Sequence, residues 1–133
     1  MLSEKYSVRF IGVVGPSMCP TLDHRDNLVL LDCFTTQFIR EPVKGEVIMA
    51  KNPYKPGNTI IKRVINTEGE LADVFSHKDG KNIKVEIPPG HIWVEGDNKE
   101  NSKDSRDFGP ISLALVEGIV RYRIFPFDKV TKL

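Results

Sequence analysis

Ser17 lies in a short loop whose composition suits a nucleophile for acyl transfer. In GVVGPSMCPTL (residues 12–22), Gly15-Pro16 and Pro20 bracket the serine directly after a predicted strand. Such a loop can expose the hydroxyl and leave backbone N–H groups free beside it. Attack on a carbonyl needs the first feature, and stabilisation of an oxyanion needs the second. Glycine, proline and serine are also ordinary turn residues, so the segment taken alone is more simply explained as a turn.

Lys62 occupies a position where lysine is unexpected. In TIIKRVI (residues 59–65) side chains alternate between two faces, so Lys62 shares its face with Ile60 and Val64. Burial there would disfavour the ammonium, lower its pKa and leave a neutral amine able to act as a base. The alternative is an edge strand on which lysine guards against aggregation, and Arg63 fits that alternative well.

A third polar segment, EGDNKENSKDSRDFGP (residues 95–110), follows the apolar run HIWV. We expect Asp104 and Arg106 to pair across a turn, with the hydroxyl of Ser102 nearby. Loops held by such networks often carry function, although a loop of this composition is also ordinary surface. Together the three segments offer a serine nucleophile, a lysine base and an ion pair, and this form of activated serine needs no histidine.

The remaining residues exclude several classes of protein. The cysteines and histidines have none of the spacings typical of a metal site, so we expect no metal and no cofactor. One disulfide at most is possible, and the sequence leaves its formation open. Nineteen basic against eighteen acidic residues give a net charge of +1, which argues against nucleic-acid binding, because such proteins gather a basic excess on one face. The cysteines are Cys19 and Cys33, and the histidines are His24, His77 and His91. We expect Cys19 to be a small buried apolar side chain.

Short strands must position these groups, because runs rich in Val, Ile, Phe and Tyr alternate with clusters of turn residues. We expect strands at 6–14, 26–32, 45–51, 58–66, 83–87, 91–97 and 116–125. Single helical turns are expected within 34–42 and 110–118, and a surface hairpin within 66–82. The pattern predicts an all-β fold, an antiparallel barrel or two packed sheets with little helix. Neither a linker nor a repeat is visible, so we expect one domain spanning residues 1–133.

Four boxes in this order resemble the type I signal peptidase family, serine proteases that use a Ser–Lys dyad. GPSMCPTL resembles the family's S-M-x-P-T-L box, and GEVIMAKNP resembles its G-D-[IV]-[IV] strand, with Glu46 where aspartate is usual. IIKRVINTEGE resembles the K-R-V-x-x-x-x-G-D box, again with Glu70 for aspartate. IPPGHIWVEGDNKENSKDSRDFGPI resembles P-x-G-x-x-[FW]-V-x-G-D-N-x-x-x-S-x-D-S-R-x-[FY]-G. The boxes cover residues 10 to about 125. Within the family, their residues are most similar to those of catalytic subunit 1 of the mitochondrial inner membrane peptidase.

The resemblance implies a signal-peptidase-like catalytic domain in which Ser17 is the nucleophile and Lys62 the general base. By the same resemblance, Ser102 would hydrogen-bond the lysine amine and orient it. Asp104 and Arg106 would form a supporting salt bridge beneath the site.

The resemblance also implies the substrates, which would be precursor proteins with cleavable signal or sorting peptides. Small residues, often in an A-x-A-like pattern, would precede the cut. The peptide would bind extended against strand edges, and the candidate edges are 11–15 and 58–62. Val13, Ile61 and Val64 would suit a shallow pocket for the small residues.

Two features depart from the family pattern. Many bacterial members carry a serine two residues before the nucleophile as a second oxyanion donor, and Gly15 stands at that position here. Members normally carry a membrane-spanning segment before the nucleophile box. Only sixteen residues precede Ser17, and nothing approaches about 20 consecutive apolar residues, so we expect the N-terminal anchor to be absent.

Partner and location also follow from the resemblance. It implies a heterodimer with a second peptidase subunit, through which the chain would be membrane-associated. The location would be the mitochondrial inner membrane, with the catalytic domain facing the intermembrane space.

Two other functions compete with this one. A self-cleaving repressor-type Ser–Lys protease would share the dyad, but the string D-N-x-x-x-S-x-D-S-R (residues 97–106) belongs to signal peptidases. A catalytically silent β-domain that only binds peptides or a partner subunit would be expected to have lost Ser17 or Lys62, and both are present. We therefore predict a signal peptidase I-type serine endopeptidase.

Overall fold

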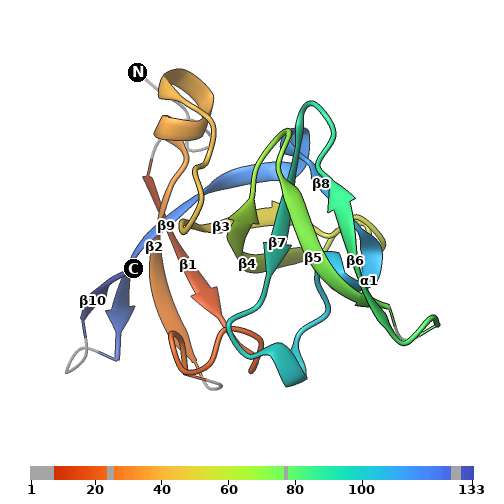
Figure 1. Cartoon of the computed structure of the whole chain (residues 1–133). Helices are drawn as coiled ribbons and strands as arrows, with labels where there is room; N and C mark the ends of the chain where they lie inside the picture. Colours follow the sequence, from red (N-terminus) through yellow and green to blue (C-terminus); the bar gives the residue numbers. More distant parts are fainter. Residues whose placement is uncertain (1–7, 24–25, 77, 127–129) are drawn as a thin grey trace.

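A curled antiparallel sheet forms most of the protein (Figure 1). The computed structural model describes residues 8–23, 26–76, 78–126 and 130–133. The strands in these residues are β1 (Val8–Val13), β2 (Asn27–Asp32), β3 (Val47–Lys51), β4 (Thr59–Asn66), β5 (Leu71–Ser76), β6 (Lys81–Glu86), β7 (His91–Glu95), β8 (Ile111–Ser112), β9 (Val116–Phe125) and β10 (Thr131–Lys132). The main sheet runs in the order β1-β2-β9-β3-β4-β7-β8, with β10 paired to β9, and β5 pairs with β6 separately. The predicted all-β fold with a barrel-like sheet is confirmed.

In the described residues helical structure is confined to short turns, two of which lie where they were predicted while the two between β7 and β8 were not predicted. A π-helix, η2 (Thr35–Ile39), follows β2 and lies within the predicted turn at 34–42. The 3₁₀ turn η3 (Lys99–Asn101) and the helix α1 (Ser105–Phe108) lie between β7 and β8. A further 3₁₀ turn, η4 (Leu113–Leu115), precedes β9 within 110–118. Among the described residues, no helix combines the length and the apolar character needed to cross a membrane.

The central strand β3 is buried on both of its faces, because β9 and β4 flank it and side chains cover both sides of the sheet. Val47 and Met49 pack in one apolar cluster. Ile48 and Ala50 pack in a second cluster on the opposite face. This two-sided burial explains why GEVIMAK reads as a continuous apolar run rather than an alternating one.

Strand β4 is paired on both sides along only part of its length. It pairs with β3 from Thr59 to Arg63, but its pairing with β7 begins at Arg63. Residues 59–62 therefore keep one free edge among the described strand pairings. Lys62 lies where that free edge ends, and only 5% of it is exposed. The edge-guard explanation for Lys62 is wrong, because an aggregation guard acts by holding its charge in solvent.

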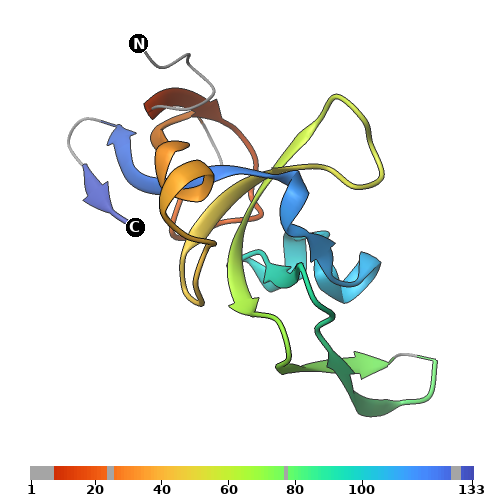
Figure 2. The same cartoon turned by 90° about the horizontal axis from the view of Figure 1, so that it is seen from above.

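The hairpin of β5 and β6 projects away from the main sheet (Figure 2). The surface hairpin predicted within 66–82 is present, but its first strand, Leu71–Ser76, was not recognised, and the second begins at Lys81 rather than 83. The residues LADVFS mix an acidic side chain with a small one and so lack a strong strand signature. Packing fixes the segment instead, since Ala72 is fully buried in a cluster with Ile87 and Trp93.

Candidate active site

The loop after β1 is anchored by two buried apolar side chains. Met18 and Leu22 are 2% and 0% exposed and pack against the cluster that contains Val47 and Met49. Backbone hydrogen bonds from Cys19 N to Pro16 O and from Leu22 N to Met18 O, both 3.0 Å, close the turn. The loop therefore has a fixed conformation, in which Ser17 is half-buried.

Ser17 and Lys62 line the same cleft. Its volume is about 220 Å³, and its walls are residues 11–15 on one side and 59–62 on the other, with Ser17, Met18 and Leu22 at one end. Within the described part of the chain, no hydrogen bond joins the Ser17 hydroxyl to the Lys62 amine or to any other group. The hydroxyl is thus free to meet a ligand in the cleft.

The Lys62 amine is held by a single described hydrogen bond. Its Nζ lies 3.0 Å from Ser102 Oγ. Burial lowers the pKa of Lys62, and the charge of Arg106 acts in the same direction, while Asp104 opposes the shift. Desolvation dominates because the ammonium loses the water that stabilises it. Lys62 is therefore positioned to carry a neutral amine at a lower pH than an exposed lysine would.

Asp104 continues this chain of hydrogen bonds below the lysine. The carboxylate is fully buried, and its Oδ2 accepts a hydrogen bond from Ser102 Oγ at 2.8 Å. Arg106 donates to it from Nε and Nη2, each at 2.9 Å, and the Gly96 N–H donates at 2.9 Å. Burial alone would raise the pKa of Asp104, but these hydrogen bonds outweigh burial and lower it. The carboxylate stays charged and fixes the direction in which Ser102 points.

Local sequence explains why this segment folds as it does. Asp104 caps α1 by accepting from the Arg106 N–H, while the Asp107 side chain accepts from the Asp104 N–H at 3.0 Å. This reciprocal arrangement is a capping box, which satisfies two backbone donors at once. The hydroxyl of Ser105 accepts from Val94 N at 2.9 Å and ties the helix to β7. The hydrogen bonds within residues 102–107 (SKDSRD), together with the tie to β7, therefore fix the position of Asp104.

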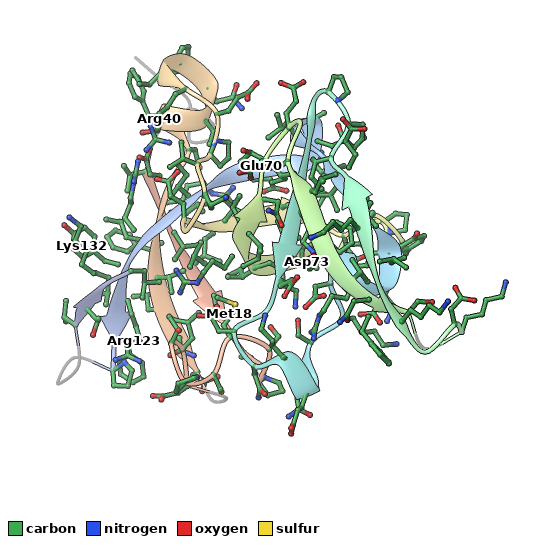
Figure 3. The ribbon with its side chains drawn as sticks, in the orientation of Figure 1. Met18, Arg40, Glu70, Asp73, Arg123 and Lys132 are labelled. Atoms are coloured by element: carbon green, nitrogen blue, oxygen red, sulfur yellow. The ribbon has the colours of Figure 1, made fainter. Side chains whose placement is uncertain are left out.

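Three consecutive backbone amides after β7 join the two halves of the site. Gly96 N donates to Asp104, Asp97 N to the Met18 sulfur at 3.4 Å, and Asn98 N to Ser17 O at 2.9 Å. The Met18 side chain lies beside this segment in Figure 3. The segment 96–98 thus holds the serine loop and the Ser102 loop against each other.

Gly96 is at the point of closest approach. A Cβ added there would lie 2.1 Å from Ser102 Oγ and 2.6 Å from Ser17 O. Contacts this short cannot be accommodated without displacing one of the two serine segments. The glycine is needed here for lack of space, in contrast to Gly15, which has open space but a φ of +122° that disfavours any other residue.

A second ion pair braces the same segment from the other side. Arg63 donates to Asp97 from Nε at 2.9 Å and from Nη2 at 2.8 Å, and Thr21 Oγ1 also donates to Asp97. Burial would raise the pKa of Asp97, and the hydrogen bonds from Arg63 and Thr21 lower it below its usual range. Thr21 belongs to the serine loop and Arg63 follows the lysine, so this carboxylate links the two.

The structure brings all five predicted site residues together: Ser17, Lys62, Ser102, Asp104 and Arg106. Sequence reasoning missed the roles of four others, namely Arg63, Gly96, Asp97 and Asn98. The signal for the last three was the string GDN directly after a buried strand. Arg63 had been explained as an edge charge, yet it faces Asp97.

The cleft walls agree only in part with the pocket predicted for small residues. Val13 and Ile61 line the cleft, but Val64 does not. Val64 is fully buried in the second apolar cluster, because it lies on the opposite face of β4 from Ile61.

The remaining candidates for chemistry that the structure describes do not join the site. Cys19 is half-buried rather than fully buried, Cys33 is buried, and both are free thiols. His91 lies at the start of β7, and its Nδ1 is 2.8 Å from Pro89 O. His24 and His77 fall outside the described residues. Among residues 8–23, 26–76, 78–126 and 130–133, no group of three or more potential ligands could hold a metal ion.

Comparison with known proteins identifies the class. The family described as signal peptidase, peptidase S26, matches residues 2–79 and 67–125. The chain belongs to this family and is a signal peptidase I-type hydrolase.

Curated relatives narrow the comparison. The chain is 40% identical to mitochondrial inner membrane protease subunit 1 of Xenopus tropicalis over 123 residues, which cover 90% of this chain and 72% of that protein. It is 36% identical to mitochondrial ATP-independent inner membrane protease subunit 1b of Arabidopsis thaliana over 116 residues, covering 86% and 68%. Subunit 2 of the mouse protease matches at 35% over 125 residues, covering 91% and 69%. The names support a mitochondrial inner membrane location and a protease made of more than one subunit.

A solved structure supports the fold. Signal peptidase I from Enterococcus faecalis V583 aligns with a TM-score of 0.52 at 22% sequence identity, covering 61% of this chain and 97% of that one. The curled antiparallel sheet is therefore of the signal peptidase I type.

Proposed function

We propose that this chain is a serine endopeptidase that uses Ser17 and Lys62 as a catalytic dyad to cleave signal or sorting peptides from precursor proteins. One observation carries the proposal. Lys62 is buried, is held by the Ser102–Asp104 chain of hydrogen bonds, and lines the same cleft as Ser17. A desolvated lysine beside a serine hydroxyl is a known form of activated nucleophile.

In the acylation step, the neutral Lys62 amine takes the hydroxyl proton of Ser17 while Oγ attacks the carbonyl carbon of the scissile bond. The ammonium passes that proton to the leaving nitrogen as the C–N bond breaks, and an ester remains on Ser17. Lys62 then takes a proton from water, which attacks the ester. The proton returns to Ser17 Oγ as the C–O bond breaks. Burial of the amine favours the neutral form that each proton uptake requires.

The Ser17 N–H is the proposed oxyanion donor, because in the described chain it has no hydrogen-bond partner of its own. The positive φ of Gly15 gives a reason for glycine at the position where many bacterial relatives have serine. A serine there would be strained, so a second donor has to come from another group or from water.

Substrate is proposed to bind extended between two strand edges. β1 pairs only with β2 among the described strands, and residues 59–62 of β4 lack a partner on the cleft side. A peptide backbone could add to both edges. Val13 and Ile61 narrow the cleft near the dyad, which favours small residues just before the cut.

The proposed setting is the mitochondrial inner membrane, with the site facing the intermembrane space and a second peptidase subunit as partner. The relatives named as subunits 1 and 2 support this setting. Co-purification of the tagged chain with the second subunit from mitochondria, and its digestion by protease only after rupture of the outer membrane, would test it.

A cleavage assay on a precursor peptide with an alanine-rich cut site tests the dyad. Ser17→Ala should lower kcat/KM by at least about a thousandfold and change the unfolding free energy by less than about 1 kcal/mol. Lys62→Met, nearly isosteric and uncharged, should fold and fail to cleave. Retained turnover in Ser17→Ala would refute the proposed nucleophile. Retained turnover in Lys62→Met would mean that another group is the base.

A further inference from the structure

A second hollow adjoins the cleft at the end remote from Ser17. Its volume is about 570 Å³, and it lies beneath the loop of residues 52–58 that joins β3 to β4. Thr59 lines both this outer hollow and the cleft. In Figure 2 the loop projects beyond the ends of these two strands. A ligand lying along β4 past Thr59 would therefore pass from the cleft into the outer hollow.

A neighbouring depression connects the outer hollow with β1. The outer hollow shares Lys51 and Glu117 with a further depression that reaches Arg9. Arg9 precedes Ile11 by two residues on the same face of β1, and Ile11 lines the cleft. An ion pair of 3.8 Å between Arg9 and Glu117 joins β1 to β9 at this end. The cleft and the outer hollow thus form one groove that continues along β4 past Thr59, with β1 bordering the cleft and the neighbouring depression.

The surface that lines the outer hollow is mainly apolar. Pro53, Pro56 and Gly57 form its loop side, and Leu115 forms the opposite side. Leu115 is half-buried against the second apolar cluster, which leaves part of its side chain toward the hollow. An apolar side chain that entered would lose water on both sides and be stabilised by the hydrophobic effect.

The length of an extended strand determines which substrate residue would lie in the outer hollow. An extended chain advances about 3.3 Å per residue, so Thr59 lies three residues, or about 10 Å, from Lys62 along β4. If the residues next to the cut lie by Lys62, peptide positions from about four to seven residues away reach the outer hollow.

We infer that the outer hollow is a subsite for an apolar substrate side chain four to seven residues before the cleaved bond. This inference rests on the proposed function, in which small residues before the cut fill the cleft at Val13 and Ile61. Secretory signal peptides carry an apolar region upstream of a small-residue cut site, so a peptidase groove of this length would contact both features.

Binding tests the subsite without turnover. The probes are two fluorescent twelve-residue peptides with alanine one and three residues before the cut, one with leucine and the other with serine at positions four to seven before it. With Ser17→Ala protein, the leucine peptide should bind about tenfold more tightly, the factor that 1.4 kcal/mol represents. Pro56→Asp, added to Ser17→Ala, should reduce that ratio to about twofold or less, because it places a carboxylate at the hollow.

Pro89→Asp is the matched control, since Pro89 is an exposed proline in the turn before β7 and lies outside the groove. Added to Ser17→Ala, it should keep the tenfold ratio. Pro53→Asp gives an independent test of the same wall. Equal affinity of the two peptides, or a tenfold ratio that survives both Pro56→Asp and Pro53→Asp, would overturn the inference.

Cleavage by the wild-type protein separates this inference from the proposed function. If both peptides are cut and Ser17→Ala abolishes cutting, the dyad stands whatever their ratio. The subsite then requires that the leucine peptide have the lower KM. If the peptides are cut equally well at equal KM, only the subsite is refuted. If neither peptide binds or is cut, both proposals fail.

Discussion

Two carboxylate–arginine networks in this protein use the same chemistry in different surroundings. The buried network consists of Lys62, Ser102, Asp104 and Arg106, and its carboxylate is fully buried. The outer network consists of Asp32, Arg40, Glu46 and Arg121. Arg121 joins Asp32 at 2.9 Å and Glu46 at 3.1 Å, so it ties the end of β2 and the start of β3 to the middle of β9.

The networks differ in where each one ends. Both Asp32 and Asp104 have a lowered pKa, because hydrogen bonds outweigh the effect of burial. The outer network ends on the backbone of η2, where Asp32 accepts from the N–H groups of Phe34 and Thr35 at 3.0 Å. The buried network ends on an amine in a cleft. A shifted pKa or an ion pair therefore does not mark a site by itself, whereas an ion pair that orients a desolvated base does.

The largest expected difference between the two networks is that the buried one determines how cleavage depends on pH. Only neutral Lys62 can accept a proton, so kcat/KM should rise tenfold per pH unit until the pKa of Lys62 is reached. Burial lowers that pKa, so the rise should level off below the pH at which an exposed lysine titrates. A pH–rate profile measures this directly. A profile that kept rising through the ordinary lysine range would contradict the desolvated base.

Asp104→Asn should affect both activity and stability. It removes the negative charge paired with Arg106, and breaking a buried ion pair costs about 3–5 kcal/mol of unfolding free energy. It also removes the negative charge that opposes the shift of Lys62, so the rising limb of the pH–rate profile should move to lower pH while its plateau falls. Denaturant unfolding and the same assay measure the two effects. An unchanged limb would show that Asp104 does not act on the lysine.

Gly96→Ala tests the contact between the two serine segments. The added methyl would meet Ser102 Oγ and Ser17 O at 2.1 and 2.6 Å, so we expect a loss of about 1–3 kcal/mol of stability and at least a tenfold fall in kcat. Gly12→Ala is a control for stability only, because a Cβ there meets nothing within 4 Å although the residue lines the cleft. Full activity in Gly96→Ala would mean that the serine segments can separate without consequence.

Asp32→Asn, in the outer network, should have the smallest effect. It weakens the contacts to Arg121 and to the start of η2, at a cost of about 1–2 kcal/mol, and should leave kcat/KM unchanged. Since the folded pKa of Asp32 is lowered, its contribution is present above the unfolded pKa and is lost as pH falls through the folded value. In thermal unfolding followed from pH 7 into the acid range, variant and wild type should therefore converge as the folded Asp32 becomes protonated. A change in kcat/KM would show that the outer network also reaches the site.

The sequence was most informative where a residue conflicts with its surroundings. The alternation of strand faces made a desolvated Lys62 one of two explanations of TIIKRVI, and the bracketing turn residues made Ser17 a candidate. The resemblance to the signal peptidase family then favoured both roles. The pairing of Asp104 with Arg106 followed from their spacing. These features are local, so a single segment contains their cause.

The missed features depend on contacts between distant segments. Gly96 contacts Ser17 and Ser102 because it follows β7 and lies between two loops, and the string GDN marks the segment without showing which loops it contacts. Arg63 and Asp97 are 34 positions apart, so their pairing depends on the register between β4 and β7. Val64 was assigned to the cleft by residue type, although strand alternation already placed it opposite Ile61.

The three amides of residues 96–98 also serve as a built-in reporter. Each donates to a different part of the site, to Asp104, to the Met18 sulfur and to Ser17 O. Their hydrogen–deuterium exchange rates therefore reflect whether the serine loop and the Ser102 loop are in contact. An inhibitor or partner that loosens either loop would speed exchange at these positions, whether or not a substrate for the protein is in hand.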